Sequence, residues 1–115
     1  MRTRLLTAFA ALAFTGSFAQ TQAGDATQGK ALYMKNMCWT CHGTAGQGGD
    51  RGSGPRIAYD VWPWEGFSQQ VRRPRESMPR YDARHVSDQE LADIYAYIVS
   101  LRPGPKARDI PLLKE

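Results

Sequence analysis

The run Cys38-Trp39-Thr40-Cys41-His42 constrains this chain of 115 residues more than any other feature. Two cysteines three positions apart lie on the same side of a helical turn, and the histidine follows directly. This spacing allows both thiols to add to the vinyl groups of one haem while the imidazole binds the iron. The run therefore predicts one covalently attached haem c, held by Cys38 and Cys41, with His42 as an axial iron ligand.

A Cys-x-x-Cys pair also occurs in redox dithiols, zinc sites and disulfides. The chain has no other cysteines, and no strand-helix-strand pattern of the thioredoxin kind surrounds the pair. A disulfide closing so small a loop would constrain the unfolded chain little. The adjoining His42 and an N-terminal export pattern favour the haem over these alternatives.

The first 23 residues have the pattern of a cleaved secretory signal. Arg2 and Arg4 precede a short apolar run, and small residues follow it. The run is shorter than the ~20 apolar residues of a spanning helix, so we expect no stable membrane insertion, with an uncleaved anchor as the alternative. We expect cleavage after Ala23, with Ala19 as the second candidate, and a mature protein in the bacterial periplasm. Removing the two arginines lowers the net charge from +4 to +2, which does not indicate nucleic-acid binding.

The mature chain is predicted to be all-α, with about three helices packed around the haem in one domain, residues 24–102. Asp25 with Gln28 resembles a capping box. The first helix should therefore begin near Ala26 and run through the haem motif to Gly43. No strand alternation or internal repeat suggests a second domain.

Two further helices are predicted after a glycine-rich loop. The second is short, with Pro63 at its first position and a proline, Pro74, after its end. The last begins at a capping box, Ser87-Asp88-Gln89-Glu90, and carries a clear apolar stripe. Residues 103–115 form a C-terminal tail. Its three apolar side chains, which we expect to pack on the domain or on a partner, are Ile110, Leu112 and Leu113.

The second axial ligand must come from a segment distant from His42, because the haem plane separates the two faces of the iron. Met78 lies in a proline-bounded loop, and a stiff loop suits a thioether, which binds iron weakly and must be positioned. Met78 is therefore predicted as the second ligand. Ligation by His85 and an open iron position are the alternatives, and an open position would indicate a haem enzyme or gas sensor.

The order of these elements resembles that of the small class I c-type cytochromes, over about residues 25–101. The resemblance implies a close crossing of the first and last helices, where Gly29 and Tyr33 would meet Ile94 and Tyr97. The shared segments are Gly29-Lys30-Ala31-Leu32-Tyr33, Cys38-Trp39-Thr40-Cys41-His42-Gly43, Gly54-Pro55, Met78-Pro79 and Leu91-Ala92-Asp93-Ile94-Tyr95-Ala96-Tyr97-Ile98.

The resemblance also implies a contact behind the histidine ligand. The carbonyl of Pro55 would accept a hydrogen bond from the second ring nitrogen of His42, which orients the ring and raises its basicity. The propionates of the haem have three candidate partners by chemistry alone, Arg56, Trp62 and Trp64.

Ligation by His42 and Met78 leaves no iron position for a substrate and raises the reduction potential. We therefore predict a one-electron carrier rather than an enzyme, serving redox protein partners in a periplasmic chain: a dehydrogenase or quinol-oxidising complex as donor and a terminal acceptor. A cytochrome subunit permanently bound to a periplasmic dehydrogenase is the alternative.

Five arginines lie close to Met78 in the sequence, with only two acidic residues among them. Around an exposed haem edge they would steer an acidic partner, because complementary charge speeds encounter. Alternatively, they are solvated charges or pair within the domain. They are Arg72, Arg73, Arg75, Arg80 and Arg84.

Overall fold

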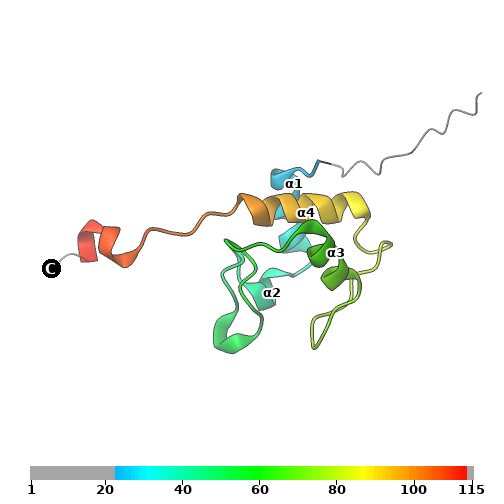
Figure 1. The fold of residues 1–115 in the computed structure, drawn as a ribbon, viewed down its shortest axis with the longest axis horizontal. Helices are drawn as coiled ribbons and strands as arrows, with labels where there is room; N and C mark the ends of the chain where they lie inside the picture. The colour runs from blue at the N-terminus through cyan, green and yellow to red at the C-terminus, as the bar shows by residue number, and fades with distance from the viewer. Residues whose placement is uncertain (1–22, 114–115) are drawn as a thin grey trace, which may run out of the picture.

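The computed structural model describes residues 23–113, and the predicted all-α fold is confirmed there, without a β-strand. Figure 1 shows α4 lying across one side of the domain beside α1, with α2 and α3 on the other side of α4. The predicted signal segment lies outside the described residues, apart from Ala23. The helices are α1 (Ala26–Lys35), α2 (Trp39–His42), α3 (Trp64–Arg72) and α4 (Asp88–Ser100), with short 3₁₀ turns at Asp50–Gly52, Ala107–Asp109 and Pro111–Leu113.

α1 begins at Ala26 as predicted, because the Asp25 side chain accepts hydrogen bonds from two backbone N–H groups of the first turn. The predicted continuation of this helix through the haem motif is wrong. α1 ends at Lys35, Asn36 caps it, and Met37 takes a left-handed backbone conformation with φ of 59°. The haem motif therefore forms a separate helical turn, α2, whose direction differs from that of α1 because the chain turns at Met37.

α1 and α4 cross in close contact. A Cβ atom built on Gly29 would overlap the carbonyl group of Asp93 and lie 2.9 Å from Cβ of Tyr97, so only glycine fits there. The rings of Tyr33 and Tyr97 lie 5.4 Å apart between centroids. Tyr33 is fully buried and belongs to the same apolar cluster as Ile94. The crossing expected from the resemblance is confirmed.

The ends of the other two helices follow local sequence signals. Ser87 Oγ accepts from the Glu90 N–H at 3.2 Å, and Glu90 Oε2 accepts from the Ser87 N–H at 2.8 Å, which is the predicted capping box of α4. α3 begins at Trp64, one residue later than predicted, with Pro63 as the cap. It ends at Arg72, ahead of the proline expected to stop it.

The C-terminal tail leaves the domain after α4. Figure 1 shows the segment that follows α4 running away from the four helices. Leu112 is 95% exposed, so it does not pack on the domain. None of the helices within residues 23–113 is long and apolar enough to span a membrane.

Candidate functional site

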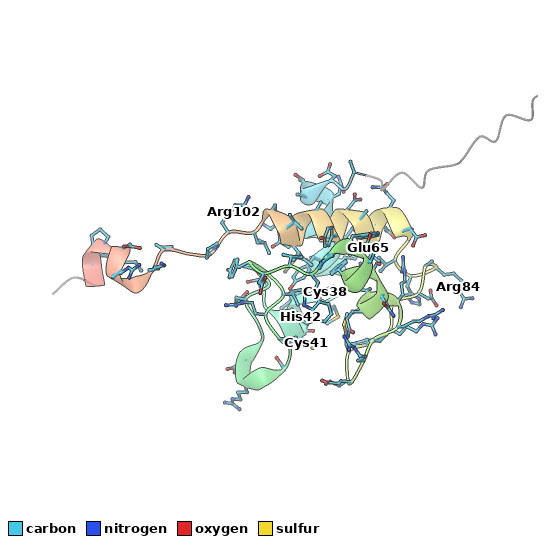
Figure 2. The ribbon with its side chains drawn as sticks, viewed as in Figure 1. Cys38, Cys41, His42, Glu65, Arg84 and Arg102 are labelled. Carbon is cyan, nitrogen blue, oxygen red and sulfur yellow. The ribbon has the colours of Figure 1, made fainter. Side chains whose placement is uncertain are left out.

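A largely apolar cavity of about 690 Å³ lies beneath α4, between α2, α3 and the loop before α4. Its lining includes Cys38, Cys41 and His42 from the motif and Met78 from the loop. Figure 2 shows the three motif residues close together at the centre of the domain. Ligand pockets commonly have volumes of about 300–1,000 Å³ and apolar walls with a few placed polar groups. The structure thus brings the predicted thioether cysteines and both predicted iron ligands to one cavity.

The two cysteines lie at the start of the short helix α2 and within it. Cys38 is its N-terminal cap with helical backbone angles, and the helix ends at His42, after which Gly43 turns the chain with φ of 79°. The two cysteines do not form a disulfide with each other. Burial raises the pKa of the Cys38 thiol to about 11, so before haem attachment this thiol would be protonated at neutral pH. A redox-active dithiol requires a lowered thiol pKa, and the dithiol alternative is therefore disfavoured.

Two tyrosine hydroxyls fix the chain as it leaves the motif. Tyr33 on α1 donates to the carbonyl of Gly43 at 2.6 Å, and Tyr97 on α4 donates to the carbonyl of Thr44 at 2.9 Å. Burial raises the pKa of both hydroxyls, so they stay protonated and remain donors. The two tyrosines at the crossing of α1 and α4 thus position the motif through hydrogen bonds. The sequence predicted only that these tyrosines belong to the apolar faces of their helices.

The imidazole of His42 has a partner behind it. Its Nδ1 lies 2.8 Å from the carbonyl oxygen of Pro55, the contact that the resemblance implied. Because a carbonyl can only accept, Nδ1 carries the proton and Nε2 is left with a free lone pair for a metal. The loop is held close to the motif at Gly54, where a Cβ atom would lie 2.8 Å from the carbonyl carbon of Cys41.

Met78 is half-buried and packs against the apolar core. The last turn of α3 holds its loop: the Val71 carbonyl accepts from the Tyr81 N–H at 3.2 Å, and the Gln70 side-chain amide lies 3.8 Å from the Met78 sulfur. On the other side, the Tyr81 hydroxyl donates to the carbonyl of Asn36 at 2.9 Å. From the sequence, the flanking prolines predicted only that the loop is stiff. The hydrogen bonds to α3 and to Asn36 show what holds the loop in place.

His85, the alternative ligand predicted from the sequence, is not in the cavity lining. Its side chain is 82% exposed, and Nδ1 lies 3.7 Å from a carboxylate oxygen of Asp82. The backbone N–H groups of Arg84 and His85, which bond to this carboxylate, lower the pKa of Asp82. His85 therefore belongs to an exposed turn before α4.

Only two of the three candidate propionate partners lie at the cavity. Arg56 and Trp62 line the cavity, whereas Trp64 does not. The Trp64 ring packs instead against the ring of Tyr95, 5.4 Å away between centroids, and its proposed role at the cavity is not supported. Arg75, which sequence reasoning assigned only to the arginine group, also lines the cavity, with its guanidinium 6.0 Å from the centre of the Trp62 ring.

The five arginines near Met78 do not form one group. Arg72 is largely buried, and its guanidinium donates to the carbonyls of Tyr81 and Val86 and to the carboxylate of Asp88. Arg84 pairs with Asp82 at 3.5 Å. The remaining three have exposed side chains and are called here the arginine surface: Arg73, Arg75 and Arg80.

The helical fold and a cavity offering two thiols, an imidazole with a free nitrogen and a thioether define a c-type cytochrome, and the residues present fit a covalently bound haem. The family described as cytochrome c oxidase, cbb3-type, subunit III matches residues 24–98. The chain belongs to this family and therefore contains a haem c domain for electron transfer, with Cys38, Cys41 and His42 as the attachment motif. Neither a curated protein nor a solved structure matches the chain.

Proposed function

We propose that this protein is an exported one-electron carrier whose haem iron is ligated by His42 and Met78. The observation that carries the proposal is the shared cavity: the His42 ring and the Met78 side chain come from segments 36 residues apart and line the same apolar space. A bound haem supplies reversible one-electron chemistry at its iron. Two protein ligands would occupy both axial positions, so that oxidation and reduction need no ligand exchange.

The protein supplies attachment, orientation and an apolar environment. Cys38 and Cys41 would hold the haem through thioethers, while the Pro55 carbonyl orients the ring of His42 for metal binding. The apolar core residues around the cavity would lower the polarity around a bound haem, which would disfavour the more highly charged oxidised state and raise the reduction potential. A thioether ligand from Met78 would act in the same direction.

Carbon monoxide tests whether both axial positions are filled. A six-coordinate iron binds this gas only as fast as a protein ligand leaves, so we expect slow and incomplete binding to the reduced native protein. Rapid, complete binding would contradict the proposal and would favour the haem enzyme or gas sensor that an open position implies.

Export to the periplasm rests on the sequence pattern of residues 1–23. If the signal is cleaved after Ala23, the native protein begins at Gly24. The mass of the protein purified from a bacterial periplasmic fraction measures this directly. A native protein that retains Arg2 and Arg4 would contradict cleavage.

A second role, as a permanently bound subunit of a redox complex, is favoured by two observations. The family description names an oxidase subunit, and Leu112 is 95% exposed on a tail that leaves the domain. Size-exclusion chromatography of a native extract separates the two roles. A carrier should elute as a free protein of the size of one chain, whereas a subunit should elute in a stable heteromer.

A further inference from the structure

The Met78 sulfur has a hydrogen-bond donor beside it. The side-chain Nε2 of Gln70 lies 3.8 Å from Sδ, within the longer range that sulfur acceptors show. Both side chains are half-buried and line the same cavity. A thioether sulfur has two lone pairs, so one can bind a metal while the other accepts this hydrogen bond.

The position of Gln70 relative to Met78 is fixed by its neighbours on α3. The next residue, Val71, accepts the backbone N–H of Tyr81 at 3.2 Å. The residue after that, Arg72, donates to the carbonyl of Val86 at 2.6 Å. Three consecutive residues of α3 therefore hold the loop that contains Met78, and the contact of Gln70 with the sulfur belongs to this set.

We propose that Gln70 is a positioning residue for the Met78 thioether and that it raises the reduction potential of the haem. The inference rests on the proposed ligation by Met78. A hydrogen bond to the free lone pair withdraws electron density from the sulfur, which weakens its donation to the metal. Weaker donation disfavours the oxidised state more than the reduced state. The same hydrogen bond restricts rotation of the sulfur away from the metal.

The test compares holoprotein variants at two adjacent glutamines. Gln70→Leu keeps a good helix former of similar size but removes the donor. Gln69→Leu is the matched control, since Gln69 is an exposed residue of the same helix and does not line the cavity. The lost donor changes the relative free energies of the two oxidation states by only part of a net hydrogen bond. We therefore expect Gln70→Leu to make reduction about threefold less favourable, which is a fall of about 28 mV at 59 mV per tenfold.

Two further readouts separate an effect on the sulfur from a general loss of structure. In Gln70→Leu, the near-infrared sulfur-to-iron band should shift, and added imidazole should displace Met78 from the oxidised protein about threefold faster. Gln70→Glu provides a second variant of nearly the same shape. Its carboxylate cannot donate and adds a negative charge that stabilises the oxidised state, so its potential should lie below that of Gln70→Leu.

A Gln70→Leu protein with the potential, band position and displacement rate of Gln69→Leu would overturn the proposal. A potential higher than that of the control would overturn it too. Failure of the underlying ligation gives a different result, because the wild-type protein itself would then lack the sulfur-to-iron band.

Discussion

The Nδ1 atom of His42 lies 2.8 Å from the carbonyl oxygen of Pro55, 13 residues further along the chain. This contact assigns the proton to Nδ1 and leaves Nε2 available for the metal. It also joins the short helix α2 to the glycine-rich loop, so that the orientation of the ring depends on a backbone atom of another segment.

Replacing Pro55 with alanine should loosen this contact without removing the carbonyl. Alanine frees the backbone φ angle that proline fixes, so the Nδ1 proton should exchange with solvent several-fold faster, as measured by NMR of the reduced holoprotein. The free energy of unfolding should fall by about 0.4–1 kcal/mol. Pro103→Ala in the exposed segment after α4 is the control, and it should leave the His42 proton unchanged. Equal proton exchange in the two variants would contradict the role of the Pro55 carbonyl.

The crossing of α1 and α4 should be intolerant of a single methyl group. Gly29→Ala places a Cβ atom against the carbonyl of Asp93, and overpacking of this kind costs about 1–3 kcal/mol. Gly104→Ala is the matched control, because nothing lies within 4 Å of its added Cβ atom, and it should change stability by less than about 0.5 kcal/mol. Urea unfolding of the holoproteins measures both. Similar midpoints for the two variants would show that the helices can separate without cost.

Arg72 should behave as a structural residue rather than as a docking charge. Its guanidinium donates to two carbonyls and one carboxylate, and lysine cannot reach all three groups. Arg72→Lys should therefore lower the free energy of unfolding by about 1.5–3 kcal/mol, whereas Arg73→Lys on the exposed arginine surface should change it by less than about 0.5 kcal/mol. Urea denaturation distinguishes them, and equal effects would refute the assignment.

The arginine surface should steer an acidic electron-transfer protein. Arg80→Glu should lower the second-order rate at low salt and flatten its dependence on ionic strength, because exposed charges act over a Debye length of about 10 Å at 0.1 M salt. Arg102→Glu is the control and should have a smaller effect. Arg102 follows the C-terminal end of α4, whereas the loop that contains Arg80 precedes its N-terminal end, near the labelled Arg84 (Figure 2). Stopped-flow rates at several salt concentrations measure this. A wild-type rate that does not fall with salt would rule out steering.

Local signals in the sequence predicted much of the fold. The capping box at Ser87 and Glu90 placed the start of α4 at the observed residue. The haem motif and the proline-bounded loop identified the cavity residues His42 and Met78. These features depend on neighbours in the sequence, or on chemistry that few residue types can supply, and are therefore readable from one chain.

The structure differs from the sequence-based predictions where contacts between distant segments determine how the chain folds. Helical spacing continued through Asn36 and Met37, but the chain turns there, and the motif occupies a separate turn. Trp64 suited a propionate by chemistry, yet its ring packs against Tyr95. Gln70 had no distinguishing pattern, because its contact with the sulfur exists only when the loop folds back on α3.

Ligation of the haem iron by Met78 is the central claim, and the near-infrared absorption of the oxidised protein tests it most directly. A sulfur-to-iron charge-transfer band is expected in the wild-type protein and in Met34→Ala, whose side chain is exposed and does not line the cavity. Met78→Ala should lose the band, and its reduction potential should fall. A Met78→Ala protein that keeps the band would contradict the assignment of Met78 as the second ligand.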